Sequence, residues 1–261
     1  MARIVWGATG ERYYENGVDR GVLYVGSLPG VPWNGLTSVN VSSDGGDAKP
    51  YYIDGVKYLN LPSPEDFRAT ISAYTYPDEF GVCDGSVKVR PGLFATRQRR
   101  KTFGFSYRTM IGNDLSAEHG YKIHLIYNAM AAPSGADYRT VSDNIDPEDF
   151  SWSVTARPPV TTGYHRTPHI VIDSRTTNAE TIAVLEDILY GTNEFEARLP
   201  DFDELVEIFD DNATFEVIDN EDGTFTVIGP ESAIQMLDEE TFQITWPTAI
   251  FVDEDSYTIS S

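Results

Sequence analysis

The sequence predicts a mainly β protein, and three observations support this prediction. Turn-forming and aromatic residues are abundant, with 21 Gly, 15 Pro, 15 Tyr and 13 Phe in 261 residues, as is typical of β folds with many short connections. Asp54-Gly55 separates two runs rich in aromatic and β-branched residues, which is the pattern of a tight β-hairpin. Apolar and polar residues alternate from Phe67 to Ala73, as they do in strands that are buried on one face, and Tyr121, Ile123, Leu125 and Tyr127 share one face of a second expected strand.

The hairpin at Asp54-Gly55 is predicted to form an arm, at about residues 42 to 62. Pro62-Ser63-Pro64 separates it from the strand that follows, because proline cannot continue a central strand. The arm carries three tyrosines and little charge, so in a free monomer it would expose apolar surface of the kind that marks a partner. A hairpin folded onto the core of its own chain fits the same residues. The candidate inter-subunit contacts on the arm are Tyr51, Tyr52, Ile53, Val56 and Tyr58.

Ahead of the arm, the sequence predicts short strands and loops. Gly7-Ala8-Thr9-Gly10 resembles a nucleotide-binding turn, but no helical period follows it, so we reject that interpretation. The expected order is a strand with Tyr13-Tyr14, a turn at Asn16-Gly17, a strand at 22–25, a loop at 26–35 anchored by Trp33, a strand at 36–41 and a flexible loop at 42–49.

Beyond the strand at Phe67 to Ala73, the expected elements are a loop or helical turn at 77–80, strands at 87–89, 103–107, 121–128 and 150–155, and a central strand at 170–172. Cys83 is the only cysteine, expected at a strand end as a small packed hydrophobe. Residues 97–101 form the only basic cluster. At a sheet edge such a cluster prevents edge pairing or forms salt bridges, which we favour over a nucleic-acid patch. An acidic surface on a neighbouring copy would complement it. The candidate contacts here are Arg97, Arg99, Arg100 and Lys101.

Two helices are predicted near the end of a first domain that spans residues 1 to 210. The first, at about 178–190, has Thr177 and Glu180 at capping-box spacing and Gly191 as a stop. The second, at 201–209, starts after Pro200 with acids in its first turn. Residues 211 to 261 are expected to form a small acidic α+β unit, with a hairpin of 214–218 and 224–228, a short helix at 231–237, and strands at 242–246 and 249–252.

Charge is distributed very unevenly along the chain. The net charge is −22. Residues 1 to 175 hold 18 Lys and Arg against 19 Asp and Glu, whereas residues 176 to 261 hold one basic residue, Arg198, against 22 acids. The acidic third should repel DNA phosphates, and it favours solubility.

Candidate chemistry is sparse. His165 and His169 have a spacing that suits a zinc site on a helix, but Gly163 and Pro168 argue against a helix there. His124 is expected at a surface or an interface. Residues 219–223 only superficially resemble a calcium loop, since the first and last ligand positions fail. No Gly-x-Ser-x-Gly elbow, secretory leader or membrane span is apparent in the sequence. We therefore expect no catalytic, metal or cofactor site.

Four blocks of the sequence resemble the major tail tube proteins of long-tailed (siphovirus-type) phages, especially those that infect actinobacteria. They are residues 10–21 (GERYYENGVDRG), 31–36 (VPWNGL), 49–58 (KPYYIDGVKY) and 119–128 (HGYKIHLIYN). The resemblance covers most of residues 1 to 210. It implies a β-sandwich or barrel with a flanking helix, hexameric rings that stack into a tube, and DNA that passes through the lumen into the host without specific binding.

The resemblance also implies partners and a location. The partners would be copies of the chain itself and other tail proteins, namely the tape measure, the tail terminator and the distal tail protein, with no membrane. The location would be the virion tail, and the host cytoplasm during assembly. The acidic unit at 211–261 is expected outside the tube, because six copies would not fit in a channel. The alternative from the residues is a carbohydrate-binding β-sandwich module or glycosidase-like enzyme, and a weaker one is a distal tail or capsid decoration protein.

Overall fold

The computed structural model describes residues 6–45, 49–61, 65–135, 149–161, 163–211, 216–219, 225–228, 234–236, 242–244, 249–253 and 256–259. The strands of the first 173 residues are β1 (Tyr14–Tyr24), β2 (Val31–Pro32), β3 (Leu36–Gly45), β4 (Lys49–Ile53), β5 (Val56–Leu61), β6 (Glu65–Ala73), β7 (Val87–Arg90), β8 (Leu93–Ala95), β9 (Phe103–Gly112), β10 (Gly120–Ala131), β11 (Phe150–Ala156) and β12 (His169–Asp173). The helices are a 3-10 turn at Asp78–Phe80, α1 (Gly81–Asp84), α2 (Ala179–Tyr190) and α3 (Phe202–Asp211). The prediction of a mainly β fold is confirmed.

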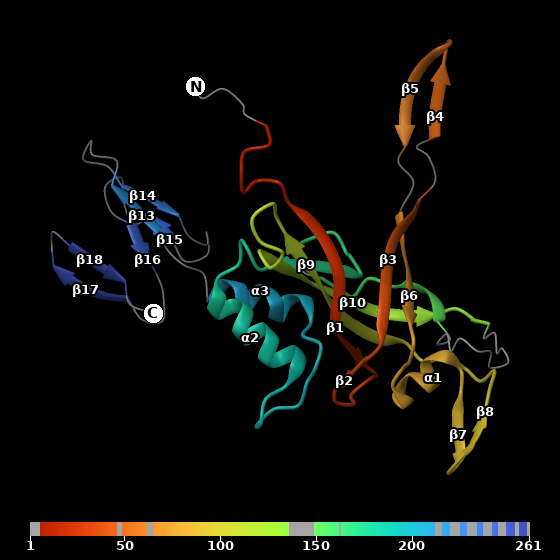
Figure 1. Ribbon diagram of the computed structural model, residues 1–261. Helices are drawn as coiled ribbons and strands as arrows, with labels where there is room; N and C mark the ends of the chain where they lie inside the picture. The colour runs from red at the N-terminus through yellow and green to blue at the C-terminus, as the bar shows by residue number, and fades with distance from the viewer. Residues whose placement is uncertain are drawn as a thin grey trace.

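One antiparallel sheet forms the body of the molecule, in the order β2-β1-β9-β10-β11-β6-β3 (Figure 1). β10 has β9 along one edge. Its other edge is shared, because residues 122–126 pair with β12 and residues 129–131 pair with β11. β1 also contacts β3, so the sheet curls and its two ends approach each other. The expected apolar strand at 170–172 exists, but as a short strand on the edge of β10 rather than in a central place, because no further strand pairs with it among the described residues.

The apolar residues form two clusters. The first lies inside the curled sheet and includes Leu23 of β1, Ile71 of β6 and Trp152 of β11, each 2% exposed or less. Trp33 closes this cluster, as expected, and its indole Nε1 donates to the carbonyl of Thr75 at 2.9 Å.

The second cluster joins the sheet to the two helices. Ile123, Leu125 and Tyr127 of β10 pack with apolar residues of α2 and α3, and Figure 1 shows both helices together beside the strands. The predicted buried face of β10 is therefore confirmed. Leu185 and Leu189 of α2 are fully buried, as a helix with one apolar stripe requires.

Four local predictions fail. The flexible loop expected at 42–49, as the start of the arm, is strand at residues 42–45, which continue β3 and pair with β6. The expected turn at Asn16-Gly17 is a bulged stretch inside β1, where the register with β9 shifts twice and Gly17 has a φ of 69°. A bulge accommodates extra residues without ending the strand. Cys83 is fully buried as predicted, but it lies in α1 rather than at a strand end. The cap of α2 is Asn178, whose side-chain oxygen accepts from the Glu180 N–H at 3.1 Å. Gly191 ends α2 as predicted.

In the C-terminal segment, the described residues form three hairpins: β13 (Glu216–Asp219) with β14 (Phe225–Ile228), β15 (Ile234–Met236) with β16 (Phe242–Ile244), and β17 (Ala249–Asp253) with β18 (Ser256–Ile259). The first hairpin is confirmed. The helix predicted over 231–237 is wrong at residues 234–236, which pair with β16 as a strand. A short apolar run does not distinguish a helix from a strand by its period alone. The division of the chain at residue 210 stays a prediction.

Candidate assembly surfaces

The arm predicted around Asp54-Gly55 is present as the hairpin β4–β5. Asp54 and Gly55 have φ values of 51° and 76°, as a type I′ turn requires at both central residues. Among the described residues, the hairpin is a separate two-stranded sheet with no further strand paired to it. Figure 1 shows it standing beyond one end of β3 and β6.

The arm exposes its apolar side chains. Tyr51, Tyr52 and Ile53 of β4 are 51%, 63% and 53% exposed, and Val56 and Tyr58 of β5 are 69% and 67% exposed. The alternative that this hairpin folds onto its own core is therefore wrong. A two-stranded hairpin has marginal stability in water unless one of its faces packs against something. The arm thus has the properties of a surface that another chain covers.

A second projecting hairpin was missed by the sequence reasoning. In the part of the chain that the structure describes, β7 and β8 pair only with each other, and Figure 1 shows them at the end of the molecule opposite to β4–β5. Leu93 and Phe94 are 56% and 55% exposed. The overlooked signal is Pro91-Gly92, which stands between two apolar runs and has Gly92 at a φ of 79°, as a proline–glycine turn favours.

The basic cluster does not lie near the arm. It follows β8 and runs along α1, where the Gln98 N–H donates to Gly85 and the Lys101 N–H donates to Val82. Since β9, the next strand, pairs on both sides, the cluster is not part of a sheet edge, and the edge-protection interpretation is wrong. Arg99 and Lys101 are exposed, and so is Arg97, whereas Arg100 is half-buried with its guanidinium 3.9 Å from a carboxylate oxygen of Asp84.

His124 and His169 form a pair that the sequence did not predict. His124 Nδ1 and His169 Nε2 are 3.2 Å apart, and His124 Nε2 is 3.0 Å from the Thr109 hydroxyl. The ring of His124 stacks on Tyr107 at 4.5 Å between centroids. Burial and the neighbouring His169 lower the pKa of His124 to about 4, and burial lowers the pKa of His169. His124 is therefore half-buried inside its own chain rather than a surface residue.

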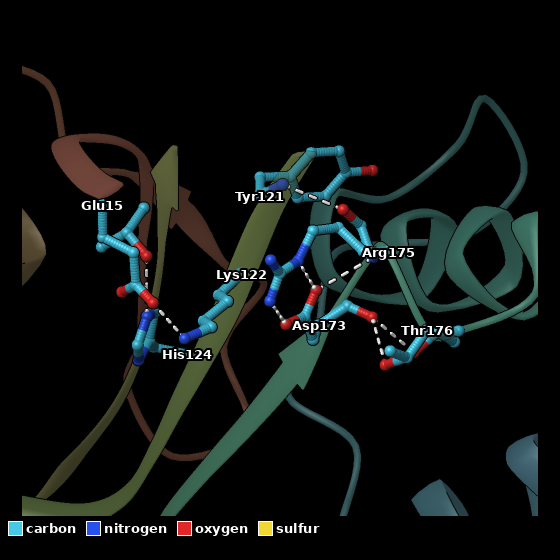
Figure 2. Close-up of polar contacts among 10 residues, drawn as sticks. Glu15, Tyr121, Lys122, His124, Asp173, Arg175 and Thr176 are labelled. Atoms are coloured by element: carbon cyan, nitrogen blue, oxygen red, sulfur yellow. Dashed lines mark hydrogen bonds and ion pairs between the residues drawn. The ribbon is translucent and has the colours of Figure 1, made fainter. Parts of the chain in front are cut away.

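Two charged contacts, one on β10 and one at the end of β12, are drawn with His124 in Figure 2. Lys122, two residues before His124 on β10, forms an ion pair with Glu15 of β1. On β12, the two carboxylate oxygens of Asp173 accept from the Arg175 guanidinium at 2.9 and 2.6 Å, and this pairing lowers the pKa of Asp173. The Lys122–Glu15 ion pair joins β10 to β1, whereas the Asp173–Arg175 contact lies within the segment at the end of β12.

The described part of the chain holds no group of three or more His, Cys, Asp or Glu residues arranged to bind a metal. His165, whose spacing from His169 suits a zinc site, is exposed. The hydrogen bonds described for His124 and His169 do not involve it. Among the residues that the structure places, no helix is long and apolar enough to span a membrane.

No protein-family model and no curated protein matches the sequence. A chain of the PVC sheath–tube complex of an extracellular contractile injection system, in its extended state, is similar with a TM-score of 0.33 and 14% identity, over 59% of this chain and 88% of that chain. A chain from the tube-terminating cap of the anti-feeding prophage has a TM-score of 0.35 and 10% identity, over 67% and 97% of the two chains. A chain from the six-fold symmetrised baseplate of that prophage has a TM-score of 0.33 and 8% identity, over 65% of this chain and 97% of that chain. TM-scores this low carry no argument about assembly or function.

Proposed function

We propose that this protein is a structural subunit of a phage tail, which assembles with copies of itself into stacked hexameric rings and so forms the tube through which DNA is ejected. The observation that carries the proposal is the β4–β5 arm, with its exposed tyrosines Tyr51, Tyr52 and Tyr58. The block 49–58, which resembles tail tube proteins, is this same arm.

The position of the arm supports contact along one axis. β4–β5 and β7–β8 project at opposite ends of the molecule (Figure 1), and each exposes apolar residues. A head-to-tail contact joins two different surfaces of one chain and repeats without limit along an axis. Burial of the exposed half of one tyrosine, on the order of 100 Å², contributes about 2 kcal/mol. Several such side chains in one contact are sufficient to stack one ring on the next.

The other parts of the proposal follow from the resemblance and from the charge of the chain. Residues 1 to 175 hold 18 Lys and Arg against 19 Asp and Glu, and residues 176 to 210 add further acids, so the lumen in this proposal is neutral to acidic and DNA phosphates pass through it without binding. The tape measure, tail terminator and distal tail proteins are the further partners, and the subunit works in the virion tail after assembly in the host cytoplasm. The segment at 211–261 lies on the outside of the tube in this proposal.

The test is assembly of the purified protein with and without the apolar arm. The variant Tyr52→Ser with Tyr58→Ser removes two arm side chains that are 63% and 67% exposed. The control variant changes Tyr74 and Tyr164, which are 52% and 68% exposed and lie outside the arm, to serine. Sedimentation velocity and negative-stain electron microscopy should show rings or tubes for the wild type and the control but not for the arm variant.

Two results would refute the proposal. One is a wild-type protein that stays monomeric at high concentration, in particular if it binds glycans. The other is an arm variant that forms the same tubes as the wild type.

A further inference from the structure

A surface hollow of about 460 Å³ lies beside the basic cluster. One wall is Gln98, Arg99 and Arg100, and the other wall comes from the ends of β10 and β11, with Met130, Pro133 and Thr155. The apolar wall is partly open to solvent, since Met130 is 39% exposed. The hollow thus combines cations with an apolar surface, as contact surfaces between proteins often do.

The cations Arg99 and Arg100 of this hollow, and Lys101 beside it in sequence, have few partners within the described chain. Arg99 and Lys101 are exposed and form no ion pair there. Arg100 reaches Asp84 only at 3.9 Å, and its Nε atom is buried without a hydrogen-bond partner among the placed residues. Most of the chain's other described ion pairs are at 3.2 Å or closer. The hollow therefore presents one cation without a printed ion pair, Arg99, and a second, Arg100, that is only weakly paired.

Helix α3 presents the complementary charge. Its apolar side packs through Leu205, and its exposed side carries Asp203, Glu207 and Asp210, which at i, i+4 and i+7 form one stripe. α3 itself contains no lysine or arginine that could neutralise these acids. Glu207 and Asp210 form no ion pair with the rest of the described chain.

Within this stripe, Glu207 and Asp210 are unfavourable neighbours in an isolated copy. Like charges at i, i+3 or i+4 on a helix repel each other, and acids near a helix C-terminus face the negative end of the helix dipole. An arginine that approaches Glu207 and Asp210 from outside removes both penalties. The same contact offsets the general repulsion between copies that each carry a net charge of −22.

We infer that the basic hollow at Arg99 and Arg100 receives the acidic stripe of α3 from a second copy of this chain. The inference rests on the proposed self-assembly and assigns two surfaces to it. The surfaces differ, so the contact is heterologous, as a closed ring of more than two copies requires. The arm would then join rings along the axis, and the charged contact would join neighbours within a ring.

The experiment reverses one charge on each surface. Arg99→Glu and Glu207→Lys should each weaken association about tenfold or more, because like charges then face each other across the contact. The double variant with both changes should associate like the wild type, since the signs are again complementary. An equal mixture of the two single variants should also associate, because every contact between unlike copies is then complementary. Sedimentation velocity measures all four cases.

Matched controls separate this contact from a general effect of charge. Arg166→Glu and Glu194→Lys change the net charge by the same amounts at exposed positions that neither line the hollow nor belong to α3, and they should leave association unchanged. Raising the salt from about 0.1 M to 1 M shortens the screening length from about 10 Å to 3 Å, so the wild-type contact should weaken. Melting temperatures check that each variant is folded.

Three results would overturn the inference. If the wild type assembles and the two reversals have no more effect than the controls, the charged contact is wrong while the proposed function stands. If Arg99→Glu lowers the melting temperature but not association, the hollow is covered within its own chain. If the wild type does not assemble at all, the proposed function fails, and this contact with it.

Discussion

The histidine pair predicts a specific loss of stability in mild acid. The pKa of His124 in the folded chain is about 4, whereas an unfolded histidine has a pKa of about 6.5. Between these values the unfolded chain binds the proton and the folded chain does not, so the free energy of unfolding falls as the pH falls from about 6.5 towards 4. The stabilisation is fully present above pH 6.5.

The magnitude follows from the two pKa values. At pH 5, protonation of this one residue in the unfolded state raises the equilibrium constant for unfolding by a factor of about 30. Relative to pH 7, the free energy of unfolding is then lower by about 2 kcal/mol. Partial solvent exposure reduces this figure, so we expect between about 1 and 2 kcal/mol. The groups that face His124 are His169 and Lys122, which lower its pKa, and Glu15, which raises it.

The assay is urea unfolding of the wild type, His124→Gln and His165→Gln at pH 7 and pH 5, at concentrations where each protein is monomeric. Other groups also titrate in this range, so the informative quantity is the difference between variants. The wild type and His165→Gln, whose histidine is exposed, should lose about 1 to 2 kcal/mol more than His124→Gln between the two pH values. Equal losses in all three proteins would show that His124 is not held neutral by its surroundings.

Three further predictions concern the stability of the fold, each measured as the change in the free energy of unfolding. Ile71→Ala opens a cavity in the first core cluster, where Ile71 is fully buried, and should cost about 2 to 5 kcal/mol; a loss below 1 kcal/mol would contradict its place in the core. Asn178→Ala removes the cap of α2 and should cost about 1 kcal/mol, whereas Asn178→Asp should keep most of it. Gly191→Ala should cost more than about 1 kcal/mol, because Gly191 has a φ of 79° and an added Cβ would lie 2.8 Å from the backbone nitrogen of Ala197; an unchanged stability would show that the chain relaxes there.

The sequence could predict those parts of the fold that depend on neighbouring residues. The Asp54-Gly55 turn and the exposed arm follow from backbone preferences of two residues and from the composition of the strands beside them. The buried face of β6 follows from strict alternation, because successive side chains of a strand point to opposite faces. In β10 the alternation gives the face of Ile123, Leu125 and Tyr127, whereas Ile126 breaks the pattern and packs in the first cluster. The separation of a nearly neutral part from an acidic part is a property of the sequence alone.

The tertiary structure decided what depends on residues far apart in the chain. His124 and His169 meet only because β10 pairs with β12 in one register, and no local pattern specifies that register. The bulges of β1 exist because β9 pairs with it before and after Asn16-Gly17, which turns a local turn signal into an irregular strand. The hollow beside Arg99 is built from β10, β11 and the segment before β9, so its chemistry appears only when these segments are brought together. Local dihedral preferences are fixed by neighbouring residues, whereas pairing and burial are fixed by the whole chain at once.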